Sequence, residues 1–441
     1  NSINTVKKWS SKFRLKERAL IAANVQASEV VSGEKAPEVL PANDTGNAMR
    51  LQRDHGNIVR YCYATGLWYI WNGKCWQPDT STEIKRLADT SIQKMYDELK
   101  QIEGSEQQTK FLKWIHRSMM HTTKQNMIIE AQHLEGIAIE HRDLDAEHWL
   151  FNCENGTIDL STGEIKPHDQ GDHITRLSPV VYDPEATAPR WDAFINRIMD
   201  GNQELIRFLQ KAIGYSMTGS NREQVFFMLY GSGSNGKSTF IEMVQYMLGP
   251  YAKTASASSF MEKGMNNSQT NDIAALTGMR FVSAAETKRG KALDESLMKQ
   301  LTGGEKVSVR FLNKEFFEMT PTFKIWIGTN HKPNIKGDDY GIWRRVRLIP
   351  FTVTISDAEK DEELLAKLTK ELPGIFNWAL EGCMMWQREK LGLPEEIADA
   401  VTEYKSDMDV IADFLEQCTV SAEFERAYST DIYKAYCRWC E

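Results

Sequence analysis

The order of apolar and polar positions predicts different structures in successive parts of the chain. Residues 82–103 and 105–135 have apolar residues at helical spacing, whereas 67–79 and 149–165 place apolar runs on both sides of an Asn-Gly pair. Asn-Gly is a strong hairpin signal, because both residues accept the positive φ of a tight turn. We therefore predict an α+β domain over residues 48–200, in which the tryptophans pack in the core or hairpins.

A different pattern begins after residue 200. Residues 202–219 predict a helix capped at Asp200 or Asn202, and 237–248 predict a second helix. Short apolar runs that resemble buried strands occupy 225–229, 280–285, 323–329 and 345–351. Polar residues follow these runs, and ligands of parallel α/β sheets bind outside the carboxyl ends of the strands. The sequence thus predicts an α/β core over residues 201–356.

The two ends of the chain differ from this core. Residues 1–47 begin with a basic amphipathic stretch and continue into Ser, Gly, Pro and Asn, which predicts a flexible arm or linker. Residues 357–389 and 394–441 have helical patterns. We therefore expect a small, separate helical region over 357–441.

Composition limits the class of protein. The 441 residues are 41% hydrophobic and 26% charged, which is typical of a globular chain. No apolar run approaches the roughly 20 residues that span a bilayer, and no signal-peptide core is present. Seven scattered cysteines indicate a reducing compartment, so we expect cytoplasmic location, in a bacterial host or at a viral replication site. The pair Cys437-x-x-Cys440 favours helix packing over zinc binding, since it lacks a second pair.

Charge is distributed unevenly along the chain. Residues 391–441 contain twelve acidic and four basic residues, which equals the whole net charge of −8. Residues 288–347 instead contain thirteen basic and seven acidic residues, a net charge of +6. A local basic segment is typical of proteins that bind nucleic acid.

The segment YGSGSNGKSTF, residues 230–240, fits the phosphate-binding pattern G-x-x-x-x-G-K-[ST] between a predicted strand and a predicted helix. The expected ATP-binding residues are Gly231, Ser232, Gly233, Ser234, Asn235, Gly236, Lys237, Ser238 and Thr239. In this pattern backbone amides hold the phosphates, Lys237 contacts the β and γ oxygens, and Ser238 binds Mg²⁺. The sequence therefore predicts ATP and Mg²⁺ as ligands.

Polar residues after later strands are candidates for catalysis. Glu286 follows the strand 280–285 and could orient Mg²⁺ or the attacking water, and Asn330 could bind the same water or the γ-phosphate. An ordinary strand-terminal Glu and a turn Asn are the structural alternatives. Arg344 and Arg345 lie at the start of the last predicted strand. They could supply an arginine finger to the ATP of a neighbouring subunit, or they could form an ordinary solvated pair on the surface.

A hairpin is predicted between Glu286 and Asn330. Alternating residues flank the turn Leu312–Glu315, with Lys306, Arg310 and Lys314 near the arms and tip. Like charges on a protruding hairpin suit contacts with DNA phosphates, whereas the structural alternative is a solvated hairpin.

These segments, in this order, resemble the helicase domain of superfamily 3 AAA+ helicases, and more closely the phage, plasmid and poxvirus-type primase-helicases. The matching stretches are the phosphate loop, Glu286, LTGGE, GTNHKP and WRRV with IPF, and LFNCENGTIDLSTGEIKPH resembles the preceding domain. The resemblance implies a P-loop AAA+ core with Lys237 and Ser238 on phosphate and Mg²⁺, Glu286 as Walker B acid, Asn330 as sensor 1 and Arg345 as the finger. Lys306, Arg310 and Lys314 would face a DNA channel.

The predicted function is an ATP-dependent hexameric DNA helicase, the helicase part of a primase-helicase, for replication of a phage, prophage or other mobile element. The resemblance implies single-stranded or forked DNA as partner, 3′→5′ movement, a homo-hexameric ring and no membrane. A primase or polymerase would lie upstream of Asn1 or on a partner. One departure is Ala285, where relatives often have a second acid. An ATP-gated DNA-binding initiator or loader is the alternative, and a small-molecule kinase fits less well because of the basic hairpin.

Overall fold

The computed structural model describes residues 39–262, 270–285, 291–312, 315–336, 340–408, 414, 417–419 and 426–440. Two compact units divide the chain. One contains residues up to Arg60 together with Thr80–Ala138, and the other contains Tyr61–Asp79 and Ile139–Glu441. We call them the helical unit and the sheet unit.

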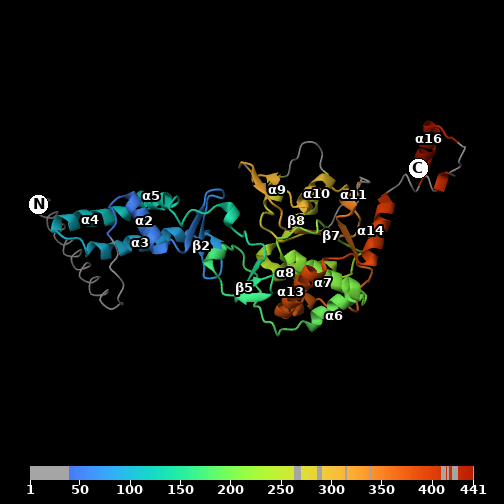
Figure 1. Ribbon diagram of the computed structural model, residues 1–441, viewed down its shortest axis with the longest axis horizontal. Coiled ribbons are helices and arrows are strands. Elements are labelled where there is room, and N and C mark those ends of the chain that lie inside the picture. The colour runs from blue at the N-terminus through green and yellow to red at the C-terminus, as the bar shows by residue number, and fades with distance from the viewer. Residues whose placement is uncertain are drawn as a thin grey trace, which may run out of the picture. The chain divides into compact units, whose positions relative to one another are not determined.

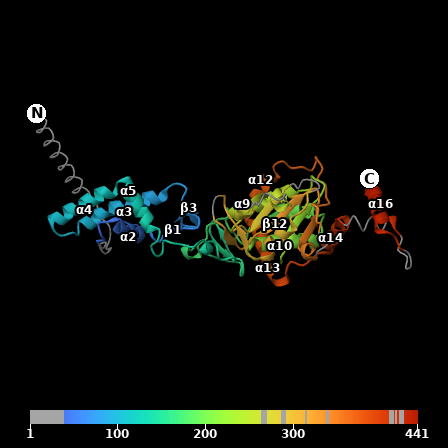
Figure 2. The same ribbon diagram turned by 90° about the horizontal axis from the view of Figure 1, so that it is seen from above.

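Helices make up the described part of the helical unit (Figure 2). They are α2 (Asp44–His55), α3 (Glu83–Leu99), α4 (Ser105–Ser118) and α5 (His121–Ala131). The last three confirm the helical spacing read over 82–103 and 105–135. Gly104, with a φ of 93°, separates α3 from α4, because this left-handed conformation is favourable only for glycine.

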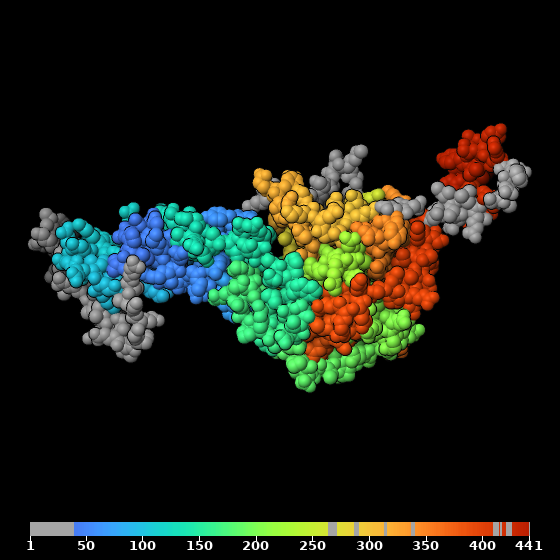
Figure 3. All heavy atoms as spheres, viewed as in Figure 1, coloured from blue at the N-terminus to red at the C-terminus, as the bar shows by residue number. Residues whose placement is uncertain are grey.

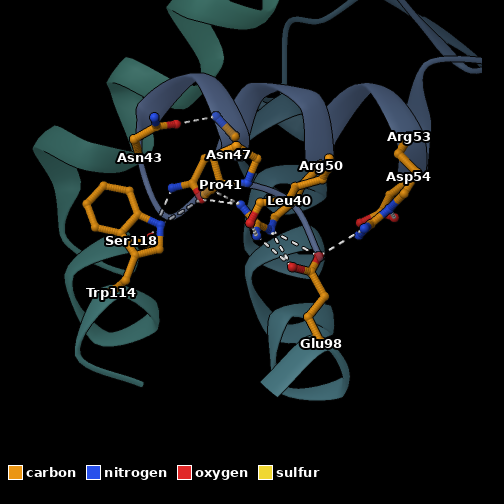
Figure 4. A network of polar contacts seen from close by, with 11 residues as sticks. Leu40, Pro41, Asn43, Asn47, Arg50, Arg53, Asp54, Glu98, Trp114 and Ser118 are labelled. Atoms are coloured by element: carbon orange, nitrogen blue, oxygen red, sulfur yellow. Dashed lines mark hydrogen bonds and ion pairs between the residues drawn. The ribbon is translucent and has the colours of Figure 1, made fainter. Parts of the chain in front are cut away.

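A buried ion pair joins α2 to α3 (Figure 4). The Arg50 guanidinium donates to the Glu98 carboxylate at 2.6 Å, and both side chains are completely buried. Arg50 also donates to the carbonyl oxygens of Leu40 and Pro41, at 2.6 and 2.8 Å. Burying charge is costly unless all its hydrogen bonds are satisfied, so these contacts fix the chain before α2 onto the unit.

Two sheets of three strands each belong to the segments with Asn-Gly turns. Their strands are β1 (Val59–Cys62), β2 (Leu67–Trp71), β3 (Trp76–Pro78), β4 (Leu150–Cys153), β5 (Gly156–Asp159) and β6 (Glu164–Lys166). Trp71 pairs with Trp76 across the first turn and Cys153 with Gly156 across the second, which confirms both hairpins. Trp68 is 9% exposed, in keeping with a packing role.

A parallel sheet of five strands forms the centre of the sheet unit. Its strands are β7 (Phe226–Tyr230), β8 (Ala252–Ser256), β9 (Phe281–Ala285), β12 (Lys324–Thr329) and β13 (Val346–Pro350). Their order is β13-β7-β12-β9-β8, and every neighbouring pair is parallel. The predicted strands and the α/β class are therefore confirmed.

Helices cover both faces of this sheet (Figure 1). One face packs against α6 (Pro189–Ile198), α7 (Gln203–Met217), α8 (Lys237–Leu248) and α13 (Leu372–Glu389), and the other against α10 (Glu295–Gly303) and α14 (Glu395–Met408). Alternate strand residues supply the two faces: Phe227 stacks on Trp326 at 4.1 Å between centroids on the first, and Phe226 lies in the core of the second.

The first two helices after residue 357 pack against helices of the sheet unit. They begin with α12 (Leu364–Thr369), and Trp386 of α13 lies 4.7 Å from Tyr215 of α7 between ring centroids. Packing therefore groups α13 with the sheet, although a separate region was expected there. The domain ranges read from the sequence stay predictions. The last described helix is α16 (Ser429–Cys440).

No described helix has the length and apolar character needed to cross a bilayer.

Candidate nucleotide site and hairpin

The loop between β7 and α8 turns sharply at two glycines. Gly233 and Gly236 have φ values of 109° and 82°, which favour glycine. A Cβ on Gly236 would also lie 2.6 Å from Ile198 Cγ2. Gly236 precedes α8 and offers no side-chain cap to its first amides. Free amides at a helix N-terminus favour an anion such as phosphate.

Lys237 is held inside this loop. Its side chain is buried, and Nζ donates to the carbonyl oxygen of Gly231 at 2.9 Å and to Asn235 Oδ1 at 2.8 Å. Burial lowers the pKa of the Lys237 ammonium from its ordinary value. An ammonium with little water around it interacts more strongly with an arriving phosphate than a surface lysine does.

The Asn235 side chain joins the loop to the chain after β13. Its Oδ1 accepts from Lys237, and its Nδ2 donates to the carbonyl oxygen of Phe351 at 3.2 Å. Phe351 N in turn donates to Tyr230 O at 2.7 Å. We call the two contacts of the Asn235 side chain, with Lys237 and with the Phe351 carbonyl oxygen, the Asn235 bridge. Sequence reasoning placed Asn235 in the loop but missed the bridge, because Phe351 lies 116 positions away and no local pattern signals the contact.

The strand register brings the other candidate positions to the same edge of the sheet. Ala285 at the end of β9 pairs with Gly328, which pairs with Leu229 next to the loop. Asn330 follows β12 directly and is exposed. Glu286 lies outside the described residues, so its predicted role stays a prediction.

The loop hydroxyls differ in their access to solvent. Ser232, Ser234 and Ser238 are exposed, and Thr239 is half-buried. Ser238 lies in the first turn of α8, next to the buried Lys237. A hydroxyl here suits one oxygen ligand of Mg²⁺, although the described residues contain no group of three or more His, Cys, Asp or Glu side chains that could hold a metal by themselves.

Arg344 and Arg345 have different surroundings. Arg345 is 9% exposed, and its guanidinium donates to Thr302 Oγ1 at 3.2 Å and to Gly341 O. Arg344 is exposed and donates to Gln224 Oε1 at 3.0 Å. The resemblance favoured Arg345 as the finger, yet its guanidinium is occupied within its own chain, whereas Arg344 lies on the surface.

The hairpin between β9 and β12 has the predicted form. Its strands are β10 (Val307–Val309) and β11 (Phe317–Met319), which pair antiparallel. Lys306 is exposed but forms an ion pair with Glu318 at 2.7 Å. Arg310 is exposed, with its guanidinium carbon 4.7 Å from the centroid of the Phe316 ring. Lys314 lies outside the described residues.

Three of the free cysteines lie near the end of the described chain. Cys418, Cys437 and Cys440 are free and exposed. Trp439 packs on Phe414, with ring centroids 5.9 Å apart, and the packing role expected of the Cys437-x-x-Cys440 pair stays a prediction.

Two family models match the chain. The model described as D5 N terminal like matches residues 48–200, and a family of unknown function matches residues 229–345, which includes the phosphate loop, Arg344 and Arg345. The first match begins within α2 and ends at residue 200, between α6 and α7, so it includes both three-stranded sheets.

Curated relatives come from large DNA viruses. The protein named "Putative helicase L207/L206" of Acanthamoeba polyphaga mimivirus is 29% identical over 299 residues, which cover 62% of this chain and 31% of that protein. "Putative helicase 184R" of Invertebrate iridescent virus 6 is 24% identical over 379 residues, 76% of this chain and 37% of that protein. The chain thus spans about a third of the length of these relatives.

The fold also occurs among solved structures. The apo structure of the NrS-1 C-terminal region has a TM-score of 0.51 with 12% identity, and the match covers 82% of this chain and 77% of that one. At this identity the likeness concerns the fold alone. The D5 N terminal like match and the names of the viral relatives agree with the resemblance to phage and viral primase-helicases read from the motifs.

Proposed function

We propose that this chain is the ATP-hydrolysing motor of a DNA helicase that serves replication of a phage, a prophage or another mobile element. The observation that carries the proposal is the buried Lys237, held by Gly231 and Asn235 at the carboxyl edge of a parallel sheet. Phosphate loops on such sheets occur in nucleotide hydrolases and kinases, and the basic hairpin favours a hydrolase. The names of the viral relatives favour DNA unwinding as the use of the hydrolysis.

The chain supplies identifiable groups for ATP. The loop amides and Lys237 would bind the phosphates, while Ser238 and Glu286 would hold Mg²⁺, which neutralises phosphate charge when bound. Asn330, exposed after β12, would orient the attacking water. These roles are those of a superfamily 3 AAA+ core, and we propose that class for the sheet unit.

The site that hydrolyses ATP would be completed by an arginine from the neighbouring subunit of a hexamer. An arginine finger must reach the γ-phosphate of a neighbouring subunit. Arg344 is exposed and makes one side-chain contact with Gln224, whereas Arg345 would first have to leave Thr302 and Gly341. We therefore assign the finger to Arg344 and a role in holding the chain before β13 to Arg345.

Strand displacement on a forked DNA tests the proposal. The protein with ATP and Mg²⁺ should separate the labelled strand, and the Lys237→Ala variant should not. ATP hydrolysis without strand displacement would favour the initiator or loader, in which ATP controls DNA binding. Absence of ATP hydrolysis, from protein that is folded, would contradict the motor itself. A primase or polymerase, upstream in a longer chain or on a partner, would extend this activity.

A further inference from the structure

A buried tyrosine of α14 contacts the loop that follows β12 and contains Asn330. Tyr404 is completely buried, and its hydroxyl donates to the carbonyl oxygen of Pro333, three residues after Asn330. Burial raises the pKa of the Tyr404 phenol, so the hydroxyl keeps its proton and remains a donor. The carbonyl of the loop thus has a fixed partner on a helix that lies far away in the sequence.

The residue before Pro333 makes a second connection to the same helix. Lys332 Nζ pairs with Asp407 Oδ2 at 2.7 Å, and the Lys332 side chain is only 12% exposed. Nζ also lies 5.2 Å from the centroid of the Tyr230 ring and 5.5 Å from that of Tyr404. An ammonium between two aromatic rings, with little water around it, binds its partner more strongly than a surface lysine does. Two successive residues of the loop are therefore attached to α14.

The loop has little else to hold it across the molecule. Thr329 Oγ1 accepts from the amide of His331 at 3.1 Å and donates to its carbonyl oxygen at 2.6 Å, which shapes a turn around Asn330. This turn connects the loop only to the end of its own strand. A group that orients a reacting water must be placed precisely, because a displacement of about 1 Å can cost about 100-fold in rate. The contacts with α14 supply that precision.

The other side of Tyr404 meets the segment that contains the arginine pair. Its ring lies edge-on to the ring of Trp343, with centroids 5.2 Å apart and planes at 82°. Trp343 ends α11 (Tyr340–Trp343) and directly precedes Arg344. Figure 3 shows α14, in red-orange, beside the orange segment that includes α11. One side chain therefore contacts both the loop of Asn330 and the segment that leads to Arg344.

We propose that Tyr404 is a positioning residue for ATP hydrolysis: its hydroxyl holds the loop that presents Asn330, and the Lys332–Asp407 pair secures the same loop to α14. The inference rests on the proposed function, since it names a residue that positions groups of the same motor. Tyr404 does not belong to the phosphate loop, so its loss should leave ATP binding nearly unchanged. A misplaced Asn330 should instead slow the chemical step, which lowers kcat without raising KM.

Tyr404→Phe tests the inference, because it keeps the ring on Trp343 and removes only the donor. Steady-state ATP hydrolysis by the whole protein should show kcat lowered about tenfold, the effect of one lost hydrogen bond at the upper end of its usual range, with an unchanged KM. Tyr251→Phe is the matched control. Tyr251 is also buried in the sheet unit, and its hydroxyl accepts from the backbone amide of Asn152 at 3.0 Å. Both variants lose one buried hydrogen bond and similar stability, but Tyr251→Phe should keep the wild-type kcat.

A second variant tests the ion pair without touching the core. Asp407 is 47% exposed, so Asp407→Asn should fold normally while it removes the charge that holds Lys332. It should lower kcat about threefold and leave KM unchanged. Asp361→Asn removes the charge from an exposed pair with Lys367 and is the control, which should match the wild-type protein.

The outcomes separate this inference from the proposed function. Normal hydrolysis by the wild-type protein, with equal kcat for Tyr404→Phe and Tyr251→Phe, would overturn the positioning role and leave the motor standing. A raised KM with unchanged kcat in Tyr404→Phe would place the residue in ATP binding and contradict the inference. Absence of hydrolysis by folded wild-type protein would overturn both. If Tyr404→Phe does not fold, Asp407→Asn decides, and a kcat equal to that of Asp361→Asn would refute the inference.

Discussion

The phosphate loop and the β10–β11 hairpin both have basic residues at positions that a motif predicted, but their environments are opposite. Lys237 is buried and donates to Gly231 and Asn235, so its position is fixed before any ligand arrives. Lys306 and Arg310 are exposed and contact Glu318 and Phe316 on the hairpin surface. A charge that is buried and held in place can stabilise a transition state. An exposed charge is screened by solvent and salt, so it suits weaker binding that lets the ligand move along the protein.

The difference gives an order for the expected effects of substitution. Loss of a buried, preorganised group removes a specific interaction and leaves its partners unsatisfied. Loss of an exposed charge removes about one screened contact. Substitutions at the loop should therefore affect rates strongly, and substitutions at the hairpin should affect affinity modestly.

Lys237→Ala should reduce ATP hydrolysis to background, because it removes the positive charge that the loop motif places at the β and γ oxygens. The fold should persist, since Lys237 makes two polar contacts and belongs to the loop rather than to the sheet. Phosphate release and thermal unfolding measure the two parts. Lys367→Ala, which removes a surface ion pair with Asp361, is the control. Near-normal turnover in folded Lys237→Ala protein would contradict the assignment of the loop.

Arg344→Ala should slow ATP hydrolysis by about 10³-fold or more and leave ATP binding intact, because a finger in trans acts in the transition state. Arg345→Ala should instead lower the free energy of unfolding by about 1–3 kcal/mol, since Thr302 and Gly341 lose a buried donor. Mixing Arg344→Ala with Lys237→Ala subunits should restore part of the activity at interfaces with both intact groups. An inactive mixture that contains hetero-oligomers would exclude a finger at Arg344.

The contrast between these arginines shows what the sequence could and could not predict. Apolar runs and Asn-Gly pairs predicted the strands and hairpins, because those signals are local. The loop position followed from spacing for the same reason. The burial of Arg345 depends on Thr302 in α10, and the Asn235 bridge depends on Phe351, so both require the tertiary fold. Packing of α13 on α7 likewise depends on distant residues such as Trp386 and Tyr215.

Glu98→Gln should destabilise the helical unit by about 3–5 kcal/mol, because it leaves the buried Arg50 charge without a counter-charge. The rate of ATP hydrolysis by folded molecules should not change, since the loop and its contacts belong to the sheet unit. Urea unfolding followed by helical circular dichroism gives the stability. Glu106→Gln removes an exposed pair with Lys110 in the same unit and should cost at most about 1 kcal/mol. Equal effects of the two variants would contradict the importance of burial.

Asn235→Ala should weaken ATP binding about tenfold to a hundredfold, because Lys237 loses an acceptor and the loop loses its bond to Phe351. The effect should appear mainly in KM if the bridge orders the loop before binding, and in kcat if it acts in the transition state. Asn221→Ala removes a side-chain amide that donates to the carbonyl oxygen of Pro321 outside the loop, and is the matched control. Identical constants for the two variants would show that the bridge has no role in nucleotide binding.

Lys306→Ala should have the smallest effect of these substitutions, and it tests directly whether an exposed lysine of the hairpin contacts DNA. If Lys306 contacts a phosphate, its removal should lower the slope of log affinity against log salt by about one and weaken binding a few-fold at moderate salt, equally for all sequences. Because Glu318 already pairs with Lys306, part of this effect can be hidden, and Glu318→Gln should strengthen binding by a similar factor.

Lys336→Ala is a matched control, since Lys336 is 64% exposed and paired with Glu262, as Lys306 is 67% exposed and paired with Glu318. Equal salt slopes for the Lys306 and Lys336 variants would mean that the lysine does not face DNA.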